Sequence, residues 1–263
     1  MTQQHRQYLS GLKKERILLL ISRFSIAFLI IGLWELTARL EIIDSFIFSS
    51  PTRIIKCFKT LLPDGYLPKQ IGVTLLETLL SFSIVITLSM FFAIIMWRFK
   101  IIYKILEPYL ILLNSLPKSA LAPLLIVWLG NNMKTIIVAA VSVAVFGAMM
   151  SIYTGFSEID PDKIKLIRTF GGQQRHILFK LIIPSSVPTI INTIKVNLGL
   201  SLVGVIIGEF LAAKQGLGYL IIYGSQVFKM DLVLLSIVIL CIISIILYLV
   251  INIIEKNILK SRN

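Results

Sequence analysis

Charged residues and cysteines are both scarce in this sequence. Of its 263 residues, 15% are charged and 57% are hydrophobic, and the mean hydropathy is +0.90. Soluble globular domains carry about 25% charged residues, so the composition argues against an ordinary water-soluble enzyme. A disordered chain is excluded, because it would be polar. The two cysteines, Cys57 and Cys241, have no CxxC spacing and predict neither a disulfide framework nor a metal site.

The motifs of nucleotide-binding and catalytic chains are also missing. No GxxxxGK[ST] phosphate loop occurs, so we do not expect this chain to bind ATP in the P-loop manner. His5 and His176 have no ligand cluster around them, and no serine, histidine and aspartate are spaced as a catalytic set. We therefore expect no catalysis and no metal or cofactor on this chain.

Basic residues and long apolar runs are what the sequence has in excess. The formal net charge is +13, which in a soluble protein would suggest nucleic acid. Here Lys and Arg lie between apolar runs, which is typical of a membrane protein with basic loops. We expect a lipid bilayer, and no nucleic acid, as the environment of the chain.

Six runs have the roughly 20 apolar residues that a transmembrane helix needs. Three of them are free of charge: Thr78–Trp97 (within a span of about 72–97), Thr135–Ser157 and Leu232–Ile254. The other three are less regular: Ile17–Ala38, Ile105–Leu129 and Val187–Leu211. Pro117 and Pro123 predict that Ile105–Leu129 is kinked or broken. The predicted fold is an all-α polytopic membrane protein with six transmembrane helices.

The distribution of Lys and Arg predicts the orientation in the membrane. With the N-terminus inside, fifteen of these residues fall in cytoplasmic pieces and eight in outer pieces, as the positive-inside rule favours. We expect both termini, residues 1–16 and 255–263, to be cytoplasmic. The first run is too long for a cleavable signal and should remain as a span.

Two segments outside the spans have recognisable helix signals. Ser50-Pro51 is an N-cap followed by proline at the first helical position, and it opens an amphipathic helix over 50–63. That helix either lies on the outer membrane surface or packs on the bundle. The second segment, Glu158–Ser186, is far longer than a helical hairpin needs. In it, Asp160-Pro161 begins one helix, Gly171-Gly172 breaks it, and a second amphipathic helix runs to Pro184.

Ionisable residues inside spans are candidates for a solute path, because each costs about 2.5–3.5 kcal/mol at the bilayer centre. Structural pairing is the commoner fate. Glu77 lies near the outer end of its span and is expected to reach water. The predicted pathway residues are the ionisable Lys118, Lys195 and Glu209, together with the polar Asn197.

The loop Glu158–Ser186 resembles the cytoplasmic signature of permease subunits of binding-protein-dependent ABC importers. That signature is Glu-Ala-Ala, three residues, Gly, nine residues, Ile-x-Leu-Pro. Gly171 and Leu181-Ile182-Ile183-Pro184 match its second half, whereas Lys165-Leu166-Ile167 stands at the Glu-Ala-Ala positions. Lys165 therefore reverses the charge at the position of the motif glutamate.

Further stretches are similar to the nitrate/sulfonate/taurine branch of that family. They follow one another in the family's order and cover most of the chain: Ser50–Arg53, Ser115–Leu124 with Trp128–Gly130, Arg168–Gly172, Gly208–Phe210 and Gly216–Ile221. The resemblance implies the type I permease fold, with a transmembrane domain over 68–254 and coupling helices in 158–186.

The resemblance also implies a mechanism and a set of partners. Two permease subunits would form the pathway for a small solute, either as a homodimer, which is the commoner arrangement in this branch, or as a heterodimer. Separate ABC ATP-binding subunits, which carry the ATP and Mg²⁺, would dock on the coupling helices, and an extracellular or periplasmic solute-binding protein would deliver the substrate. The solutes implied are nitrate-, sulfonate- or taurine-like anions or vitamin-precursor heterocycles.

The resemblance assigns ATPase coupling to ten residues of this loop. Gly171 forms the turn, Ile167, Phe170 and Ile177 form the docking face, and Pro184 ends the second helix. The remaining members are Lys165, Arg168, Gly172, Leu181 and Ile183.

Three alternatives remain open. The first is an ABC permease of another branch, which would have a different third-span motif. The second is a membrane-embedded enzyme, which would need carboxylates or histidines facing one another, and the sequence predicts none. The third is a stand-alone secondary carrier, which copurification of an ATPase would exclude.

Overall fold

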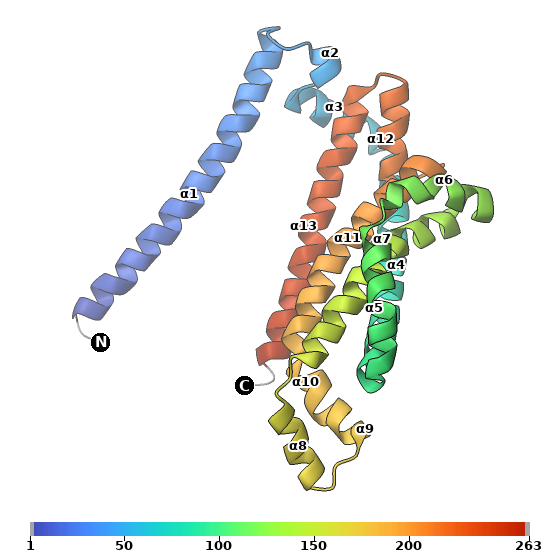
Figure 1. Ribbon diagram of the computed structural model, residues 1–263. Helices are drawn as coiled ribbons and strands as arrows, with labels where there is room; N and C mark the ends of the chain where they lie inside the picture. The colour runs from blue at the N-terminus through green and yellow to red at the C-terminus, as the bar shows by residue number, and fades with distance from the viewer. Residues whose placement is uncertain (1–2, 261–263) are drawn as a thin grey trace.

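Residues 3–260 are described by the computed structural model, and every regular element in that range is a helix (Figure 1). The elements are α1 (Gln3–Arg39), α2 (Ser45–Phe48), α3 (Pro51–Leu61), α4 (Tyr66–Arg98), α5 (Lys100–Ser115), α6 (Lys118–Leu129), α7 (Met133–Ser157), α8 (Pro161–Thr169), α9 (Gln174–Ile177), η1 (Leu178–Ile182), α10 (Ile183–Ser185), α11 (Val187–Ala212), α12 (Leu217–Gln226) and α13 (Met230–Lys260).

Length and apolar composition mark α4, α7, α11 and α13 as candidate membrane spans. Helices α5 and α6 pass the same test together, and they meet at an angle of 85°. The break falls at Leu116-Pro117, so the predicted kink of Ile105–Leu129 is present. The predicted first span, Ile17–Ala38, lies inside α1, and its crossing of the membrane stays a prediction.

Helix α7 is the centre of the bundle, with α4 and α11 packed along it. Small residues let the backbones of α7 and α11 come close: a Cβ added at Gly204 would lie 2.6 Å from Ala140 Cα. Ser89 on α4 donates a hydrogen bond to the Val145 carbonyl oxygen of α7, at 3.2 Å. Close packing and polar contacts of this kind hold helices together where lipid removes the hydrophobic drive.

The two ends of the molecule differ. The N-terminal end of α1 and the C-terminal end of α13 lie toward the end that carries α8 and α9, whereas α2, α3 and α12 lie at the other end (Figure 1). Both predicted tails therefore lie toward one side, although residues 1–2 and 261–263 are outside the described residues.

The predicted helix at Ser50-Pro51 is α3. Ser50 Oγ accepts a hydrogen bond from Arg53 N at 3.3 Å, and Pro51 is in the first turn. Ile54 is buried against α13 and its neighbours, while Ile55 and Phe58 are exposed. The helix therefore packs on the bundle by one face and leaves apolar side chains on another.

Pro184 does not end the second helix of the loop, which corrects the prediction. The chain passes from α9 through the π-helical turn η1 and α10 into α11 with only short interruptions. A π-turn is wider than an α-turn, and Pro184 sits in the first turn of α10, where a missing N–H costs little.

Candidate functional site: the α8–α10 loop and a buried polar seam

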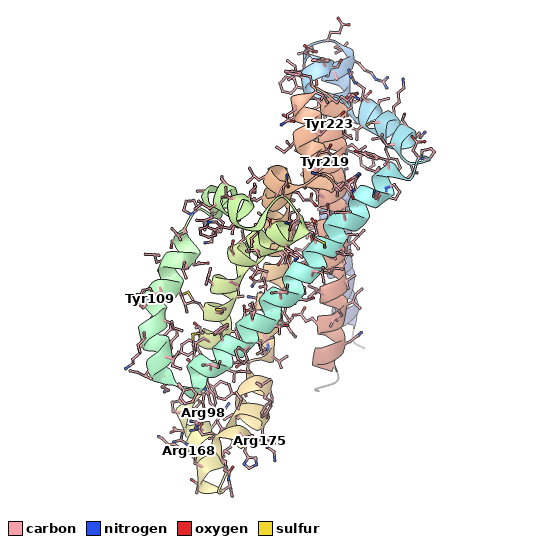
Figure 2. The ribbon with its side chains drawn as sticks, turned by 90° about the vertical axis from the view of Figure 1, so that its right-hand side faces the viewer. Arg98, Tyr109, Arg168, Arg175, Tyr219 and Tyr223 are labelled. Carbon is pink, nitrogen blue, oxygen red and sulfur yellow. The ribbon has the colours of Figure 1, made fainter. Side chains whose placement is uncertain are left out.

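Helices α8 and α9 extend beyond the bundle at one end (Figure 1). Figure 2 shows Arg98, Arg168 and Arg175 gathered at this end, whereas Tyr219 and Tyr223 lie on α12 at the other. A cavity of about 490 Å³ lies where the loop meets the ends of α4 and α7, and Trp97, Tyr153 and Arg168 are among its lining residues. The loop is thus a basic projection with a hollow behind it.

Local sequence explains the shape of this loop. The Asp160 side chain accepts from Asp162 N at 2.8 Å and caps α8. Gly171 has φ +75°, a left-handed conformation that glycine adopts at no cost. A Cβ added at Gly172 would lie 2.7 Å from the Ile167 carbonyl oxygen. Both glycines are required, the first by its backbone angle and the second by space.

The predicted docking face divides into exposed and buried parts. Phe170 is 82% exposed at the C-terminal end of α8, whereas Ile177 is 1% exposed. Ile177 packs with Phe156 and Ile182 in a core cluster, and Ile167 packs against the same cluster. The expectation that Ile177 lies on the open face is wrong, because its side chain attaches the loop to the bundle.

The other predicted coupling residues lie on or near this loop surface. Lys165 Nζ lies 2.8 Å from Asp162 Oδ1 with both side chains mostly exposed, so this pair adds little stability. Arg168 is exposed, and Leu181, Ile183 and Pro184 are half-buried.

A second set of polar residues is buried between α4, α11 and the turn before α12. Glu209 Oε1 accepts from Thr74 Oγ1 at 2.7 Å, and its Oε2 accepts from Gly218 N at 2.5 Å. Thr74 Oγ1 accepts in turn from Leu217 N at 2.8 Å, and Gln70 Oε1 accepts from Gly216 N at 2.6 Å. These acceptors take up the free N–H groups at the start of α12, which no residue within the helix can satisfy.

Glu77 belongs to the same cluster. It is 2% exposed, and its carboxyl group is a neighbour of the Glu209 carboxyl. Two predictions are corrected here: Glu77 is almost fully buried instead of exposed at the end of its span, and two carboxyl groups do face one another. Glu77 also contributes to the wall of an open cavity of about 320 Å³ that Asn131 and Lys214 line.

Four buried side-chain atoms on α4 and α11 have no hydrogen-bond partner among the described residues: Glu77 Oε2, Ser81 Oγ, Asn197 Oδ1 and Ser201 Oγ. We call Thr74, Glu77, Ser81, Asn197, Ser201 and Glu209 the polar seam. A buried polar atom without a partner is costly, and these four atoms are available to hydrogen-bond a ligand. The seam is the candidate solute contact.

The two lysines predicted for the pathway have partners outside the seam. Lys195 Nζ is paired with the Glu255 carboxylate of α13, and it lies 5.8 Å from the centre of the Tyr248 ring. Lys118 Nζ donates to the Asn114 carbonyl oxygen across the break between α5 and α6. Of the four predicted pathway residues, Asn197 and Glu209 are buried polar residues of α11, whereas the two lysines are paired elsewhere.

Within the described part of the chain, no group of three or more His, Cys, Asp or Glu is arranged to hold a metal ion. The chemistry available is therefore hydrogen bonding and charge along the seam, and surface recognition at the loop.

Comparison with known proteins identifies relatives over most of the chain. The model of the family described as binding-protein-dependent transport system inner membrane component matches residues 85–261. A Haemophilus influenzae protein named as an ABC transporter permease is 27% identical over 216 residues, which are 82% of this chain and 87% of that protein. The taurine transport system permease protein of Escherichia coli is 22% identical over 234 residues, 87% and 85% of the two chains.

Two further comparisons extend this result. The formylaminopyrimidine transport permease protein of Halalkalibacterium halodurans is 24% identical over 188 residues, 71% of this chain and 74% of that protein. An inward-facing structure of the MetNI methionine ABC transporter aligns with a TM-score of 0.64 at 18% identity, covering 75% of this chain and 96% of that one. The structural match shows that the two chains share a fold.

Proposed function

Because the chain belongs to the family of binding-protein-dependent transport system inner membrane components, and is a permease subunit of an ABC importer rather than an enzyme, we propose how it is coupled and what it carries. The α8–α10 loop receives motion from a separate ATP-binding subunit. The polar seam between α4 and α11 contacts the solute. Both chain termini are cytoplasmic, on the side of the loop.

Exposure of Phe170 is the observation that carries the coupling proposal. A phenylalanine that is 82% exposed buries little area in its own chain, so the fold does not need it. It lies beside two glycines that set the loop shape, on a projection rich in Lys and Arg. An aromatic anchor of this kind suits a partner that offers a pocket, and the resemblance to ABC permeases names the ATPase as that partner.

Ile177 and Ile167 give the loop its mechanical role. Both side chains belong to, or pack against, the core cluster that also contains Phe156 of α7 and Ile190 of α11. A displacement of the loop is thereby passed to α7 and α11 as a rigid-body movement, because packed cores shift as units. The solute seam lies on α11 and its neighbour α4.

Copurification with the ATPase tests the docking surface. We expect Phe170→Ala to leave the protein folded in the membrane but to lose most of the P-loop ATPase that a mild-detergent pulldown recovers. Phe46→Ala is the matched control, because Phe46 is also exposed, at 55%, but lies on α2 at the opposite end (Figure 1). Undiminished recovery with Phe170→Ala would place the contact elsewhere.

Gly171→Asp separates coupling from assembly. The left-handed angle at Gly171 strains any residue with a side chain, but open space surrounds the position, so the loop deforms without a clash. We expect the variant to reach the membrane and to hydrolyse ATP, in complex, without driving uptake. Normal transport by this variant would refute the role of the loop.

The solute we propose is a small sulfonate-, taurine- or nitrate-like anion or a vitamin-precursor heterocycle. The names of relatives support both classes, taurine in one case and formylaminopyrimidine in another. The seam presents hydroxyl, amide and carboxyl groups and no free lysine, which suits hydrogen-bonded recognition more than charge attraction. Uptake of labelled taurine and of formylaminopyrimidine by cells with and without the gene distinguishes the classes.

The remaining partners follow from the family. A solute-binding protein delivers the substrate to the face opposite the loop, and a second copy of this chain completes the pathway as a homodimer. Cross-linking of two differently tagged copies in the assembled complex tests the homodimer, and a heterodimer would yield no mixed product.

A further inference from the structure

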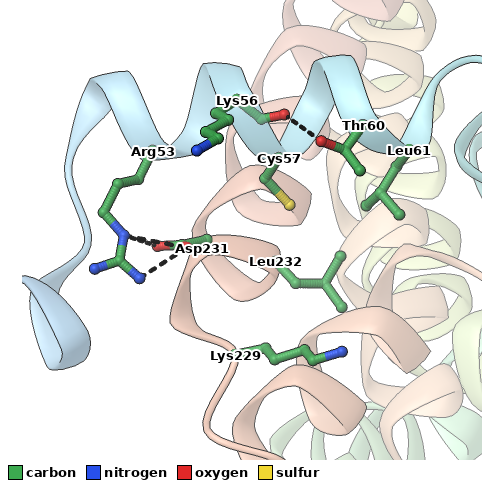
Figure 3. Close-up of a pocket in the computed structure, with 8 residues that line it drawn as sticks. All are labelled: Arg53, Lys56, Cys57, Thr60, Leu61, Lys229, Asp231 and Leu232. Carbon is green, nitrogen blue, oxygen red and sulfur yellow. Dashed lines mark hydrogen bonds and ion pairs between the residues drawn. The ribbon is translucent and has the colours of Figure 1, made fainter.

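A pocket of about 460 Å³ lies between α3 and the start of α13 (Figure 3). Three basic side chains line it: Arg53, Lys56 and Lys229. Cys57, Leu61 and Leu232 supply an apolar part of the wall. The pocket is at the end of the molecule opposite the α8–α9 projection, and the polar seam contributes nothing to it.

The charges in this pocket are unequal. Asp231 is its one acidic side chain, and both carboxylate oxygens have partners: Ser49 Oγ donates to Oδ1 at 2.6 Å, and Arg53 Nε and Nη2 donate to Oδ2 at 3.2 and 3.0 Å. Asp231 therefore neutralises Arg53. Lys56 and Lys229 are exposed, and among residues 3–260 neither has a carboxylate within 4.0 Å of its ammonium group. The pocket keeps two uncompensated positive charges.

Two residues beside the pocket, Ser49 and Phe228, have backbone angles that are unfavourable for residues with a side chain. Ser49 has φ 53° and Phe228 has φ 55°, angles that side chains other than glycine rarely adopt. Ser49 supplies a hydrogen bond to Asp231, and Phe228 directly precedes Lys229. Strained residues persist where the surrounding structure requires them, and they cluster at binding sites.

Helix α3, which forms one side of the pocket, has both apolar and basic side chains exposed. Ile55, Phe58 and Leu62 are exposed apolar side chains on or directly after this helix, while its lysines are exposed to solvent. A short helix with apolar and basic faces is typical of the membrane interface. An apolar wall beside two free lysines fits a ligand that has an anionic head and an apolar body.

We propose that the α3–α13 pocket binds the phosphodiester headgroup of an anionic phospholipid. The phosphate lies between Lys56 and Lys229, and the glycerol end of the lipid lies against Cys57, Leu61 and Leu232. A free phosphate would use the lysines and leave the apolar wall in water. An acidic surface of another protein would not need a concave wall. The shared chemistry is the anion, and the apolar wall selects the lipid.

Protection of Cys57 from alkylation reports occupancy of the pocket. The Cys241→Ala background leaves Cys57 as the one thiol among the 263 residues. In nanodiscs of phosphatidylcholine the maleimide reaction is measured with and without phosphatidylglycerol. For each variant the rate with phosphatidylglycerol is divided by the rate of the same variant without it, because the Lys229 charge itself affects the reactivity of the Cys57 thiol. We expect phosphatidylglycerol to slow the reaction several-fold.

The paired variant Lys56→Gln with Lys229→Gln should abolish this protection. A basic residue near an anionic headgroup changes affinity about fivefold, so two lysines together predict about a 25-fold loss. Lys59→Gln with Lys69→Gln is the control: it removes the same charge from exposed positions of α3 and α4 that do not line the pocket. Both variants change solvated side chains, and matching unfolding temperatures verify that they fold.

Three results would overturn the proposal. Equal protection in the pocket variant and in wild type would place the lipid elsewhere. Equal loss in the Lys59/Lys69 control would show an effect of net charge alone. Protection by inorganic phosphate in pure phosphatidylcholine would identify a free anion as the ligand. Protection by phosphatidylglycerol alone, lost only in the pocket variant, supports the site.

Discussion

Gly204→Ala should force α7 and α11 apart, because the new methyl group has no place to go. A Cβ at this position would lie 2.6 Å from Ala140 Cα and 3.1 Å from the Ala140 carbonyl oxygen. Both of these atoms belong to the backbone of α7, so no change of rotamer relieves the clash. The helices must separate along the longest contact of the bundle.

Gly199→Ala on the same helix isolates the size of this effect. A Cβ at Gly199 would meet no atom within 4 Å, so this variant gains only the helix propensity of alanine, about 0.5–1 kcal/mol. Gly204→Ala gains the same term and adds overpacking, which typically costs about 1–3 kcal/mol. The propensity terms cancel in the comparison, and the difference between the two variants is the overpacking cost.

Thermal unfolding of the two purified variants in one detergent measures that difference. For a chain of this size 1 kcal/mol moves the unfolding midpoint by about 2–4 °C, so Gly204→Ala should unfold about 2–12 °C below Gly199→Ala. Equal midpoints, or a higher one for Gly204→Ala, would refute the close packing of α11 on α7 described above.

Three further predictions concern buried or partly buried polar and ionisable groups. Ser81→Ala should be neutral or slightly stabilising, because its hydroxyl has no partner, whereas Ser89→Ala on the same helix should cost about 1 kcal/mol with the loss of its hydrogen bond to α7. The unfolding midpoints of the two variants measure this difference in stability. A lower uptake affinity for Ser81→Ala alone would link the polar seam to the solute. Lys195→Gln and Glu255→Gln should each destabilise the protein by about 1 kcal/mol, because each leaves a partly buried charge without its partner. The double variant should be destabilised by less than the sum of the two single variants. Strict additivity of the unfolding free energies would mean that the ion pair contributes nothing. Burial raises the pKa of the Cys57 thiol, so less thiolate is present at a given pH than for a free thiol. Alkylation of Cys57 should therefore be slower than that of a free thiol until the pH is well above the ordinary thiol pKa. A pH profile of the alkylation rate that coincides with that of glutathione would contradict this environment.

Local signals in the sequence predict much of the architecture. The apolar runs locate α4, α7, α11 and α13, and proline locates the 85° break between α5 and α6. Ser50 and Asp160 cap α3 and α8 as their positions before proline suggest. Each of these features depends on neighbours within a few residues, so the sequence alone contains the information.

The errors concern contacts that the local sequence does not contain. An apolar face on α9 predicts that Ile177 is available to a partner, but the ends of α7 and α11 cover it. Pro184 predicts the end of a helix, but the π-turn before it lets the chain continue into α11 with little interruption. In both cases tertiary packing decides between outcomes that the residue pattern allows equally.

The contacts of Glu209, one member of the polar seam, could have been found from sequence spacing. Glu209 stands at the end of an apolar run, and Gly216 and Gly218 follow it by seven and nine residues. A carboxylate can accept a hydrogen bond from a backbone N–H only where the backbone comes very close to it. Glycine permits that approach: a Cβ at Gly218 would lie 2.8 Å from Glu209 Oε2. A glutamate and two glycines so spaced therefore predict a carboxylate-capped turn. Thr74 and Glu77, the seam residues that lie next to Glu209, come from a helix more than a hundred residues earlier. Nothing in their own neighbourhood distinguishes them from polar residues that reach water. Their burial is set by the antiparallel packing of α4 on α11, which is the one element of the site that required the three-dimensional structure.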